Sequence, residues 1–350
     1  MTGHIAIVGA GAMGGYVGGY LARAGETVTL IDPWPDHVAA IRRDGLALEG
    51  MTEAENFRVE MRALDISDVP QLAYDAPVDI AFIGVKSYDT AWATTMIAPY
   101  LSGDGIVVSL QNCINEPEIA GIVGWGRTLG CIPARIAADA PAPGRVRRNS
   151  VLAGLPYHAY RVGEVHGRVT RRAEQLASLL SVADSCRVTT NLWGERWSKL
   201  CINGMRNALS AATGLAGNDR DSDPRLRRFG IALGGEAIRV GKALGYSLET
   251  IGRHDPEVLL RASEGDADAY AQIEAEMIEE ASASQRSADQ RPSMGQDILK
   301  GRRTEIDQMN GMIVAEAAKL GLAVPANERV VAAVRDVERG GRAGVHQVLD

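Results

Sequence analysis

Cysteine is scarce in this 350-residue chain. The four cysteines are widely spaced, and none pairs with a cysteine or histidine at a zinc-site spacing. We therefore predict no metal site and a reduced, cytoplasmic setting. The chain also lacks any run of about 18 apolar residues, so we expect no membrane-spanning helix and no membrane partner. Its first residues have neither the cationic start nor the long apolar core of a secretory signal.

Positive charge is not in excess either. The chain carries 37 Lys and Arg against 44 Asp and Glu, a net charge of -7, which argues against a nucleic-acid partner. Hydrophobic residues make up 46% and charged residues 23%, as in ordinary globular proteins, which argues against disorder and coiled coil. The length favours two domains that can bury a core without disulfides or metals.

The first part of the chain has the order strand, glycine-rich turn, helix, strand. Residues 4–8 form a short apolar run rich in β-branched side chains, which predicts a buried strand. The turn at 9–14 follows at once, and a helix is expected over 12–24. A second apolar strand at 27–31 ends at Asp32. This order is typical of the dinucleotide-binding unit of a Rossmann fold.

Each glycine of the turn has a physical role in such a unit. Gly9 permits the tight turn out of the strand, and Gly11 lets the backbone approach a pyrophosphate. Gly14 allows close packing of the helix, whose N-terminus favours the phosphate charge. The cofactor-binding residues predicted in this unit are Gly9, Ala10, Gly11, Ala12, Met13, Gly14 and Asp32.

Asp32 indicates which cofactor the unit binds. It follows Gly14 by 18 residues, near the usual spacing of about 20 for the acid that binds the ribose hydroxyls. Its carboxylate would accept hydrogen bonds from a free ribose and repel a 2′-phosphate. The segment 33–36 offers no cation to neutralise that phosphate. The sequence therefore predicts NAD as the cofactor, in preference to NADP.

The pattern of a doubly wound α/β sheet continues beyond this unit. Lys86 and Asn112 each follow a predicted strand, and strand ends face the crevice where ligands bind. Both are candidates for the cofactor or substrate edge, the alternative being a polar residue that only closes a strand. Strands are expected at 57–64, 78–85, 105–110 and 128–133, and a helix at 89–101.

The pattern changes twice further along the chain. Strands at 144–147, 151–155 and 158–165 are expected to extend the sheet as antiparallel edge strands, followed by a helix at 169–183 and a short strand at 185–190. From residue 191 onward only helical periodicity is found. We therefore predict domains at 1–190 and 191–350, the second with helices at 193–212, 226–244, 256–283, 294–320 and 327–338.

One predicted helix of the second domain carries an unusual polar face. Lys199, Asn203 and Asn207 lie at i, i+4 and i+8, so an ammonium and two carboxamides share one side. Asparagine is a poor residue inside a helix. Lysine is also rare, with five among the 37 basic residues, so a retained lysine suggests a titratable role. This pattern favours a polar site over a solvated stripe.

A second polar cluster begins at Ser293. Ser293 and the glutamine three residues later form a capping-box pattern, which predicts a helix N-cap that could also hold an anion. Asp297, Gly301 and Glu305 would fall on one helix face. Glu305 could orient a lysine or accept a hydrogen bond from a substrate hydroxyl. The alternative is an exposed glutamate paired with Arg302.

These motifs together resemble the ketopantoate reductase (2-dehydropantoate 2-reductase) family in order and spacing from residue 4 to about 327. The matching motifs are Gly-Ala-Gly-Ala-Met-Gly-Gly at 9–15, Val85-Lys86, Gln111-Asn112, Trp197-Ser198-Lys199-Leu200, the pair Asn203 and Asn207, Ser293-Met294-x-x-Asp297, Gly301-Arg302-x-Thr304-Glu305-Ile306-Asp307, Asn310-Gly311 and Pro325-x-Asn327.

The resemblance implies an N-terminal Rossmann domain, an all-helical C-terminal domain like that of 6-phosphogluconate dehydrogenase, and an active site in the cleft. It implies that Lys199 is the catalytic lysine and Glu305 the conserved acid. It also implies a reaction in which a nicotinamide cofactor delivers hydride to the C2 carbonyl of a 2-oxo acid. The further residues it implies are Asn203, Asn207 and Ser293 at the substrate, Lys86 beside the cofactor, and Asn112 beside both.

Three features depart from the family pattern. Asp32 stands where many members carry a basic residue, Cys113 replaces the glycine of Gln-Asn-Gly, and extra length is expected around 215–290. A branched or aromatic 2-oxo acid, or a sugar-acid derivative, could therefore replace ketopantoate as the substrate.

Three functional hypotheses follow from the sequence. The leading one is an NAD-linked 2-oxo acid reductase or D-2-hydroxy acid dehydrogenase that acts on a small-molecule acid. The alternative is reduction of ketopantoate to pantoate in pantothenate biosynthesis. A third is a non-catalytic NAD-binding or sensing protein, against which the pair Lys199 and Glu305 argues. Each of these hypotheses allows the chain to form a homodimer.

Overall fold

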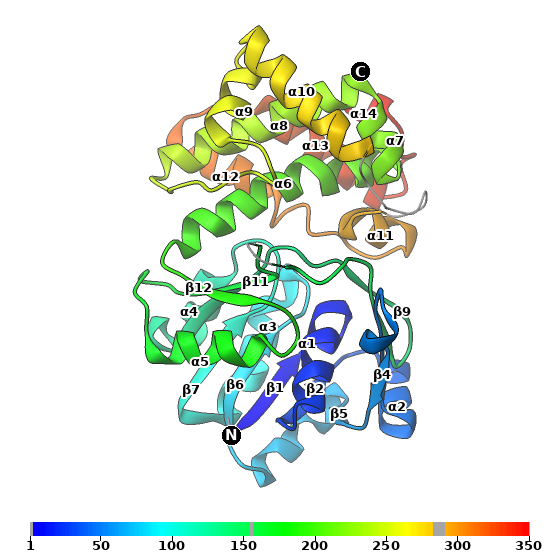
Figure 1. Cartoon of the computed structure of the whole chain (residues 1–350), viewed down its shortest axis with the longest axis vertical. Coiled ribbons are helices and arrows are strands. Elements are labelled where there is room, and N and C mark those ends of the chain that lie inside the picture. The colour runs from blue at the N-terminus through cyan, green and yellow to red at the C-terminus, as the bar shows by residue number, and fades with distance from the viewer. Residues whose placement is uncertain (1–2, 155–156, 283–290, 350) are drawn as a thin grey trace. The chain divides into compact units, whose positions relative to one another are not determined.

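The computed structural model describes residues 3–154, 157–282 and 291–349. The chain divides into two compact units, residues 1–192 and 193–350, and each is described by itself (Figure 1). The segments predicted as a strand over 151–155 and a helix over 256–283 end outside the described residues.

An eight-stranded sheet forms the centre of the first unit. Its order is β12-β11-β8-β7-β6-β1-β2-β5, and all neighbours are parallel except β11 and β8. The order reverses between β1 and β6, which is the switch point of a doubly wound fold. The strands are β1 (His4–Val8), β2 (Thr27–Ile31), β5 (Arg62–Leu64), β6 (Val78–Ile83), β7 (Leu101–Ser109), β8 (Thr128–Pro133), β11 (Tyr160–Glu164) and β12 (Cys186–Thr189).

Both faces of this sheet are covered by helices, as the sequence predicts. Alternate residues of β1 belong to two different hydrophobic clusters, Ile5 and Ile7 to one, Ala6 and Val8 to the other. Because successive side chains of a strand point to opposite faces, β1 is buried on both sides, which explains its continuous apolar run. The helices of this unit are α1 (Ala12–Arg23), α2 (Pro35–Asp44), α3 (Thr90–Ile97), α4 (Glu116–Val123) and α5 (Arg171–Leu180).

A second sheet of four strands, in the order β4-β3-β10-β9, packs on the outer side of α1. A Cβ atom on Gly15 of α1 would lie 2.8 Å from a methyl of Val146, and one on Gly19 would lie 2.4 Å from a methyl of Leu48. A Cβ on Gly18 would lie 2.7 Å from a methyl of Leu30 on β2, so the glycines of α1 let both sheets approach the helix closely. The strands are β3 (Leu46–Glu49), β4 (Phe57–Val59), β9 (Ala138–Ala142) and β10 (Arg145–Arg148).

This second sheet corrects two predictions. The expected strand over 57–64 is two strands, β4 and β5, that belong to different sheets. The strand expected at 144–147 is β10, which pairs with β3 and β9 instead of extending the main sheet. Residues 151–154 form no strand. Only β11, within the expected 158–165, extends the main sheet as an antiparallel strand.

The second unit is helical in all of its described residues that form regular structure, apart from an isolated bridge between Ile251 and His254. Its helices are α6 (Leu192–Thr213), α7 (Gly217–Ser222), α8 (Pro224–Ala243), α9 (Pro256–Ser263), α10 (Ala267–Ser282), α11 (Ser293–Leu299), α12 (Asn310–Leu320), α13 (Pro325–Glu338) and α14 (His346–Leu349). The helices expected over 256–283 and 294–320 are therefore each two helices.

Helix α8 holds α6 and α13 by buried polar contacts. The indole N–H of Trp197 on α6 donates to the carbonyl of Ala237 at 2.8 Å. The Glu236 carboxylate accepts the backbone N–H groups of Ala326 and Asn327, both at 2.9 Å. These two amides belong to the first turn of α13 and have no partner within that helix. A negative charge at this position also complements the helix dipole.

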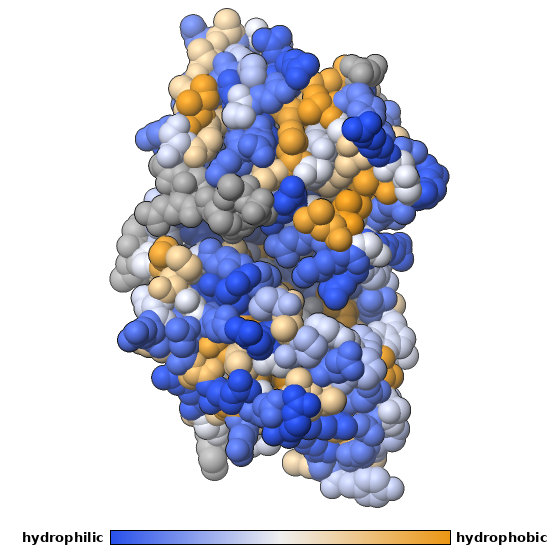
Figure 2. Space-filling view, turned by 90° about the vertical axis from the view of Figure 1, so that its right-hand side faces the viewer, coloured by the Kyte–Doolittle hydropathy of each residue, from blue (hydrophilic) through white to orange (hydrophobic). Residues whose placement is uncertain are grey.

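The sequence contains no long apolar runs, and the hydropathy of the surface drawn in Figure 2 is in keeping with this. Hydrophilic residues predominate on the face drawn in Figure 2. Among the described residues, no helix is both long enough and apolar enough to cross a membrane.

Candidate active site

The glycine-rich turn has the geometry that a dinucleotide requires. Gly9 has φ of +95°, and a Cβ there would lie 2.5 Å from the backbone nitrogen of Val85. A Cβ on Gly14 would lie 1.9 Å from the carbonyl oxygen of Gly9. A Cβ on Gly11, in contrast, would meet no atom within 4 Å. Gly9 and Gly14 are thus required by packing, whereas Gly11 leaves room for a ligand to approach the backbone.

The N-terminus of α1 fits an anion. Gly11 is its N-cap, no side chain caps the helix, and its first turn contains no acidic residue. Backbone N–H groups of a first helical turn have no partner within the helix, and the helix dipole adds partial positive charge. These features fit the pyrophosphate of a nicotinamide dinucleotide.

Asp32 is buried at the end of β2 and holds the turn in place. One of its carboxylate oxygens accepts the backbone N–H of Ala10 at 2.7 Å, and the other accepts that of Trp34 at 2.9 Å. A carboxylate can accept about four hydrogen bonds, so these two do not exclude a ribose hydroxyl. Asp32 therefore positions the glycine turn, a task that its spacing in the sequence did not reveal.

His37 was missed by sequence reasoning. Its side chain is 1% exposed, and its ring stacks on that of Trp34 with centroids 5.4 Å apart. Nε2 lies 3.0 Å from the Ala10 carbonyl oxygen, and the Gly144 N–H donates to Nδ1 at 3.0 Å. No local signal could have found it, since its partner Gly144 is 107 residues away.

Asn112 and Lys86 lie at the same carboxyl edge of the sheet as the glycine turn. Lys86 directly precedes Ser87, whose hydroxyl donates to the Asn112 carbonyl at 3.4 Å. The side chain of Asn115 donates to the same carbonyl at 2.7 Å. The ends of β6 and β7 are thus joined next to the switch point, and the contact of Lys86 or Asn112 with a ligand stays a prediction.

Gln111 is a second residue whose role the sequence did not reveal. It is buried, and its amide nitrogen donates to the Val85 carbonyl at 2.9 Å and to the Thr90 hydroxyl at 2.8 Å. Because Gly9 packs against the backbone nitrogen of Val85, Gln111 also supports the glycine turn.

Cys113 has an unusual backbone. Its φ is +65°, the only positive value for a residue other than glycine among the described residues, and its side chain is buried. A residue with a side chain loses about 1–2 kcal/mol in this conformation, whereas glycine does not. The residue that departs from Gln-Asn-Gly therefore has a backbone conformation that favours glycine.

In the second unit, Lys199, Asn203 and Asn207 lie on one continuous helix, α6. Asn207 is buried, and the other two are half-buried. On another side of α6, Cys201 is buried, and burial raises the pKa of its thiol well above the usual range. That thiol is therefore unsuited to act as a nucleophile.

The cluster near Ser293 differs in part from the prediction. Helix α11 begins at Ser293, and its N-cap is Pro292 with no side-chain cap, so the predicted capping box is absent. The side-chain amide of Gln296 instead donates to the Arg291 carbonyl at 3.0 Å. Proline at the N-cap supplies the extended backbone, with φ of -59° and ψ of 162°, from which the helix starts.

Glu305 is not on the helix face that the sequence predicts. Helix α11 ends at Leu299, and Gly301 has φ of +60°, so Asp297 and Glu305 belong to separate segments. Glu305 is 6% exposed, which contradicts the alternative of an exposed glutamate paired with Arg302.

Both segments pack against α6. A Cβ on Gly295 of α11 would lie 2.6 Å from the Ser210 hydroxyl. The side-chain amide of Asn310, five residues after Glu305, donates to the Gly204 carbonyl at 3.3 Å. Ser293 and Glu305 therefore belong to segments anchored on the helix that carries Lys199.

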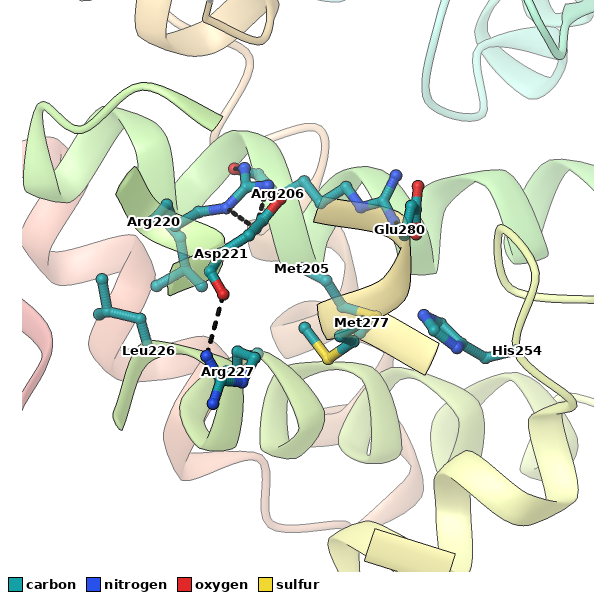
Figure 3. Close-up of a pocket in the computed structure, with 11 residues that line it drawn as sticks. Met205, Arg206, Arg220, Asp221, Leu226, Arg227, His254, Met277 and Glu280 are labelled. Carbon is teal, nitrogen blue, oxygen red and sulfur yellow. Dashed lines mark hydrogen bonds and ion pairs between the residues drawn. The ribbon is translucent and has the colours of Figure 1, made fainter. Parts of the chain in front are cut away.

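A cavity in the helical unit contains none of the predicted site residues (Figure 3). Its lining is Met205, Arg206, Leu209, Arg220, Asp221, Leu226, Arg227, Gly230, His254, Met277 and Glu280. The three arginines form ion pairs within the unit, Arg206 with Glu280, Arg220 with Asp221 and Arg227 with Glu274. Helix packing accounts for this arrangement, and we assign the cavity no substrate.

The model of the ketopantoate reductase PanE/ApbA family matches residues 5–159. The model of the C-terminal part of ketopantoate reductase PanE/ApbA matches residues 191–338. Together the two models cover most of the chain.

Individual relatives match over almost their full length. A 2-dehydropantoate 2-reductase of Archaeoglobus fulgidus is 28% identical over 343 residues, 96% of this chain and 98% of the relative. The crystal structure of a PanE/ApbA family ketopantoate reductase from Ralstonia eutropha is 29% identical, with a TM-score of 0.77 over 96% of this chain and 99% of that one. D-mandelate dehydrogenase with NADH and anilino(oxo)acetate shares the fold, at 23% identity and a TM-score of 0.79 over 96% and 98% of the two chains.

Proposed function

Because this chain belongs to the ketopantoate reductase PanE/ApbA family, we propose that it is an oxidoreductase that transfers hydride between NAD and C2 of a small 2-oxo or 2-hydroxy acid. The observation that carries this proposal is the glycine turn, with open space over Gly11 and an uncapped helix N-terminus. The family match over both units supports it. The first unit would hold the cofactor, and the second would supply the residues that act on the substrate.

The residues of the first unit would bind the cofactor by its polar ends. The turn from Gly9 to Gly14 and the N-terminus of α1 would bind the pyrophosphate. Asp32 would accept hydrogen bonds from the ribose hydroxyls and repel a 2′-phosphate, which supports NAD over NADP. Lys86 and Asn112 would lie beside the nicotinamide end, since they follow strands at the switch point. The bound cofactor would supply or accept the hydride.

The residues of the second unit would act on the acid. Negative charge develops on the C2 oxygen during reduction, and the Lys199 ammonium would stabilise that charge and donate a proton to the oxygen. Glu305 would orient the ammonium or accept a hydrogen bond from a substrate hydroxyl. The amides of Asn203 and Asn207 and the Ser293 hydroxyl would hold the carboxylate end, and Asn112 would contact substrate as well as cofactor.

Ketopantoate is the second candidate substrate, because the Archaeoglobus fulgidus relative is a 2-dehydropantoate 2-reductase. Oxidation of a D-2-hydroxy acid is the corresponding proposal for the reverse direction. A purely binding or sensing protein is disfavoured, because such a protein has little use for the pair Lys199 and Glu305.

We further propose the cellular setting of the protein and its oligomeric state. Four free cysteines, three of them buried, support a reduced, cytoplasmic setting. A homodimer is the assembly that we propose to test first, by light scattering on the purified chain.

A substrate panel tests the proposed function. Branched, aromatic and sugar-derived 2-oxo and 2-hydroxy acids, with ketopantoate among them, are assayed with NADH, NADPH and the oxidised cofactors by the absorbance of the reduced nicotinamide. We expect turnover with at least one acid and a higher kcat/KM with NADH than with NADPH. Binding of NADH without turnover of any acid would favour the sensing protein instead.

A further inference from the structure

The side chain of His37 joins the glycine turn to the second sheet. The Gly144 N–H donates to Nδ1 at 3.0 Å, so that nitrogen must carry a lone pair. The proton of the neutral ring is then on Nε2, which lies 3.0 Å from the Ala10 carbonyl oxygen and donates to it. Each ring nitrogen therefore makes one hydrogen bond, Nδ1 to Gly144 in the second sheet's turn and Nε2 to Ala10 in the glycine turn.

The contact with Ala10 fixes one peptide plane of the turn. The Ala10 N–H donates to Asp32, and the Ala10 carbonyl accepts from His37. In a trans peptide the carbonyl and the following N–H point in opposite directions. Holding the Ala10 carbonyl therefore sets the direction of the Gly11 N–H, at the residue where the structure leaves open space.

His37 is itself held on several sides. It is 1% exposed on α2, and its ring stacks on that of Trp34 with an interplanar angle of 9°. Gly144 lies in the turn between β9 and β10, where a Cβ would lie 2.9 Å from the Cβ of Ala40 on α2. Helix α2 and the second sheet thus fix the imidazole before any ligand binds.

We propose that His37 is a positioning residue for the cofactor: its neutral imidazole presets the Gly11 amide toward the pyrophosphate. The second sheet thereby contributes to cofactor affinity without touching the cofactor. This inference rests on the cofactor site proposed above.

A matched pair of variants separates the two hydrogen bonds of the ring. In His37→Gln the amide N–H can replace Nε2 and keep the bond to Ala10, but the acceptor for Gly144 is lost. In His37→Asn the amide oxygen can replace Nδ1 and keep the bond to Gly144, but the donor to Ala10 is lost. Each variant loses one hydrogen bond, so their thermal stabilities should be similar.

The readout is the Kd for NADH, measured by fluorescence quenching of the full chain. We expect His37→Asn to raise this Kd about tenfold, the effect of one hydrogen bond, and His37→Gln to stay within about twofold of the wild type. Equal Kd values for the two variants, weakened or not, would overturn the inference and leave the proposed function standing. Absence of NADH binding to the wild-type chain would overturn both.

Amide hydrogen exchange of the wild-type chain provides a test that needs no variant. If the imidazole couples the glycine turn to the second sheet, NADH should slow exchange at the Gly144 amide, because that N–H exchanges only when its bond to His37 opens. Unchanged exchange at Gly144 under saturating NADH would contradict the coupling.

Discussion

At the scale of single residues, Asp32 would have two roles that depend on different properties of its side chain. Its hydrogen bond to Ala10 needs only an acceptor oxygen, whereas repulsion of a 2′-phosphate needs the negative charge. Two charges about 4 Å apart near a protein surface interact by about 1–4 kcal/mol. The negative charge of Asp32 would therefore supply most of the proposed preference for NAD over NADP.

Asp32→Asn should reduce the preference for NADH over NADPH by about tenfold in kcat/KM, because it removes the charge and keeps an acceptor for Ala10. Asp36→Asn is the matched control, since Asp36 is an exposed acid on the first turn of α2. Steady-state kinetics with both cofactors measures the effect. An unchanged preference in Asp32→Asn would assign the discrimination to another residue.

Cys113 gives a prediction about stability. Its positive φ suits glycine, and any side chain there stores backbone strain. Cys113→Gly should therefore be more stable to urea than Cys113→Ala by about 1 kcal/mol, although both remove the same thiol. Equal stability of the two variants would show that the backbone relaxes at this position.

At the scale of elements, the join between β11 and α5 depends on one buried carboxylate. Glu164 at the end of β11 is 0% exposed and accepts two hydrogen bonds from Arg172, both at 2.7 Å. Burial raises the pKa of Glu164, but the hydrogen bonds from Arg172 and Thr170 together with the nearby charge of Arg172 outweigh it, so the net pKa lies below its ordinary value.

This carboxylate should contribute to the pH dependence of unfolding. Its folded pKa is depressed, so its stabilisation is complete above the unfolded pKa of about 4.3 and is lost as pH falls through the folded value. Glu164→Gln should reduce the slope of unfolding free energy against pH in that acidic range by up to about 1.4 kcal/mol per pH unit. Urea unfolding across this range measures it. Identical slopes would mean that folding leaves the pKa of Glu164 unchanged.

The sequence predicts elements best where one local pattern decides them. The strand and glycine turn at 4–14 and the helix α6 match their predictions because each is one continuous periodic segment. The strand over 57–64 fails because a short apolar run does not say which neighbour it pairs with. The second sheet joins Leu48 to Val146, a pairing that no local pattern encodes.

The residues of the candidate site also differ in whether a local pattern in the sequence can identify them. Glycine at positions 9 and 14 could be predicted because backbone geometry and packing restrict the residue type there, whereas the role of Gly11, which has open space around it, stays a prediction. His37 and Gln111 could not, because they act through backbone groups of distant segments. The prediction that Asp297 and Glu305 share one helix face was wrong, because the helix ends before Gly301, which has a positive φ.

At the scale of the whole molecule, each unit contributes a different part of the proposed reaction. The first unit holds the glycine turn and Asp32, and the second holds Lys199 on α6. Loss of Lys199 should therefore impair the chemical step and leave cofactor binding intact. This separation distinguishes an acid catalyst from a residue that only stabilises the fold.

The most direct measurement is kcat of Lys199→Ala with the best acid from the panel, beside the Kd for NADH. The control is Lys242→Ala, which removes another lysine of the helical unit, one that pairs with Glu257 at 2.7 Å on the surface. We predict that Lys199→Ala lowers kcat by about a hundredfold or more, with the Kd for NADH unchanged and Lys242→Ala fully active. A Lys199→Ala enzyme as active as the wild type would contradict the account.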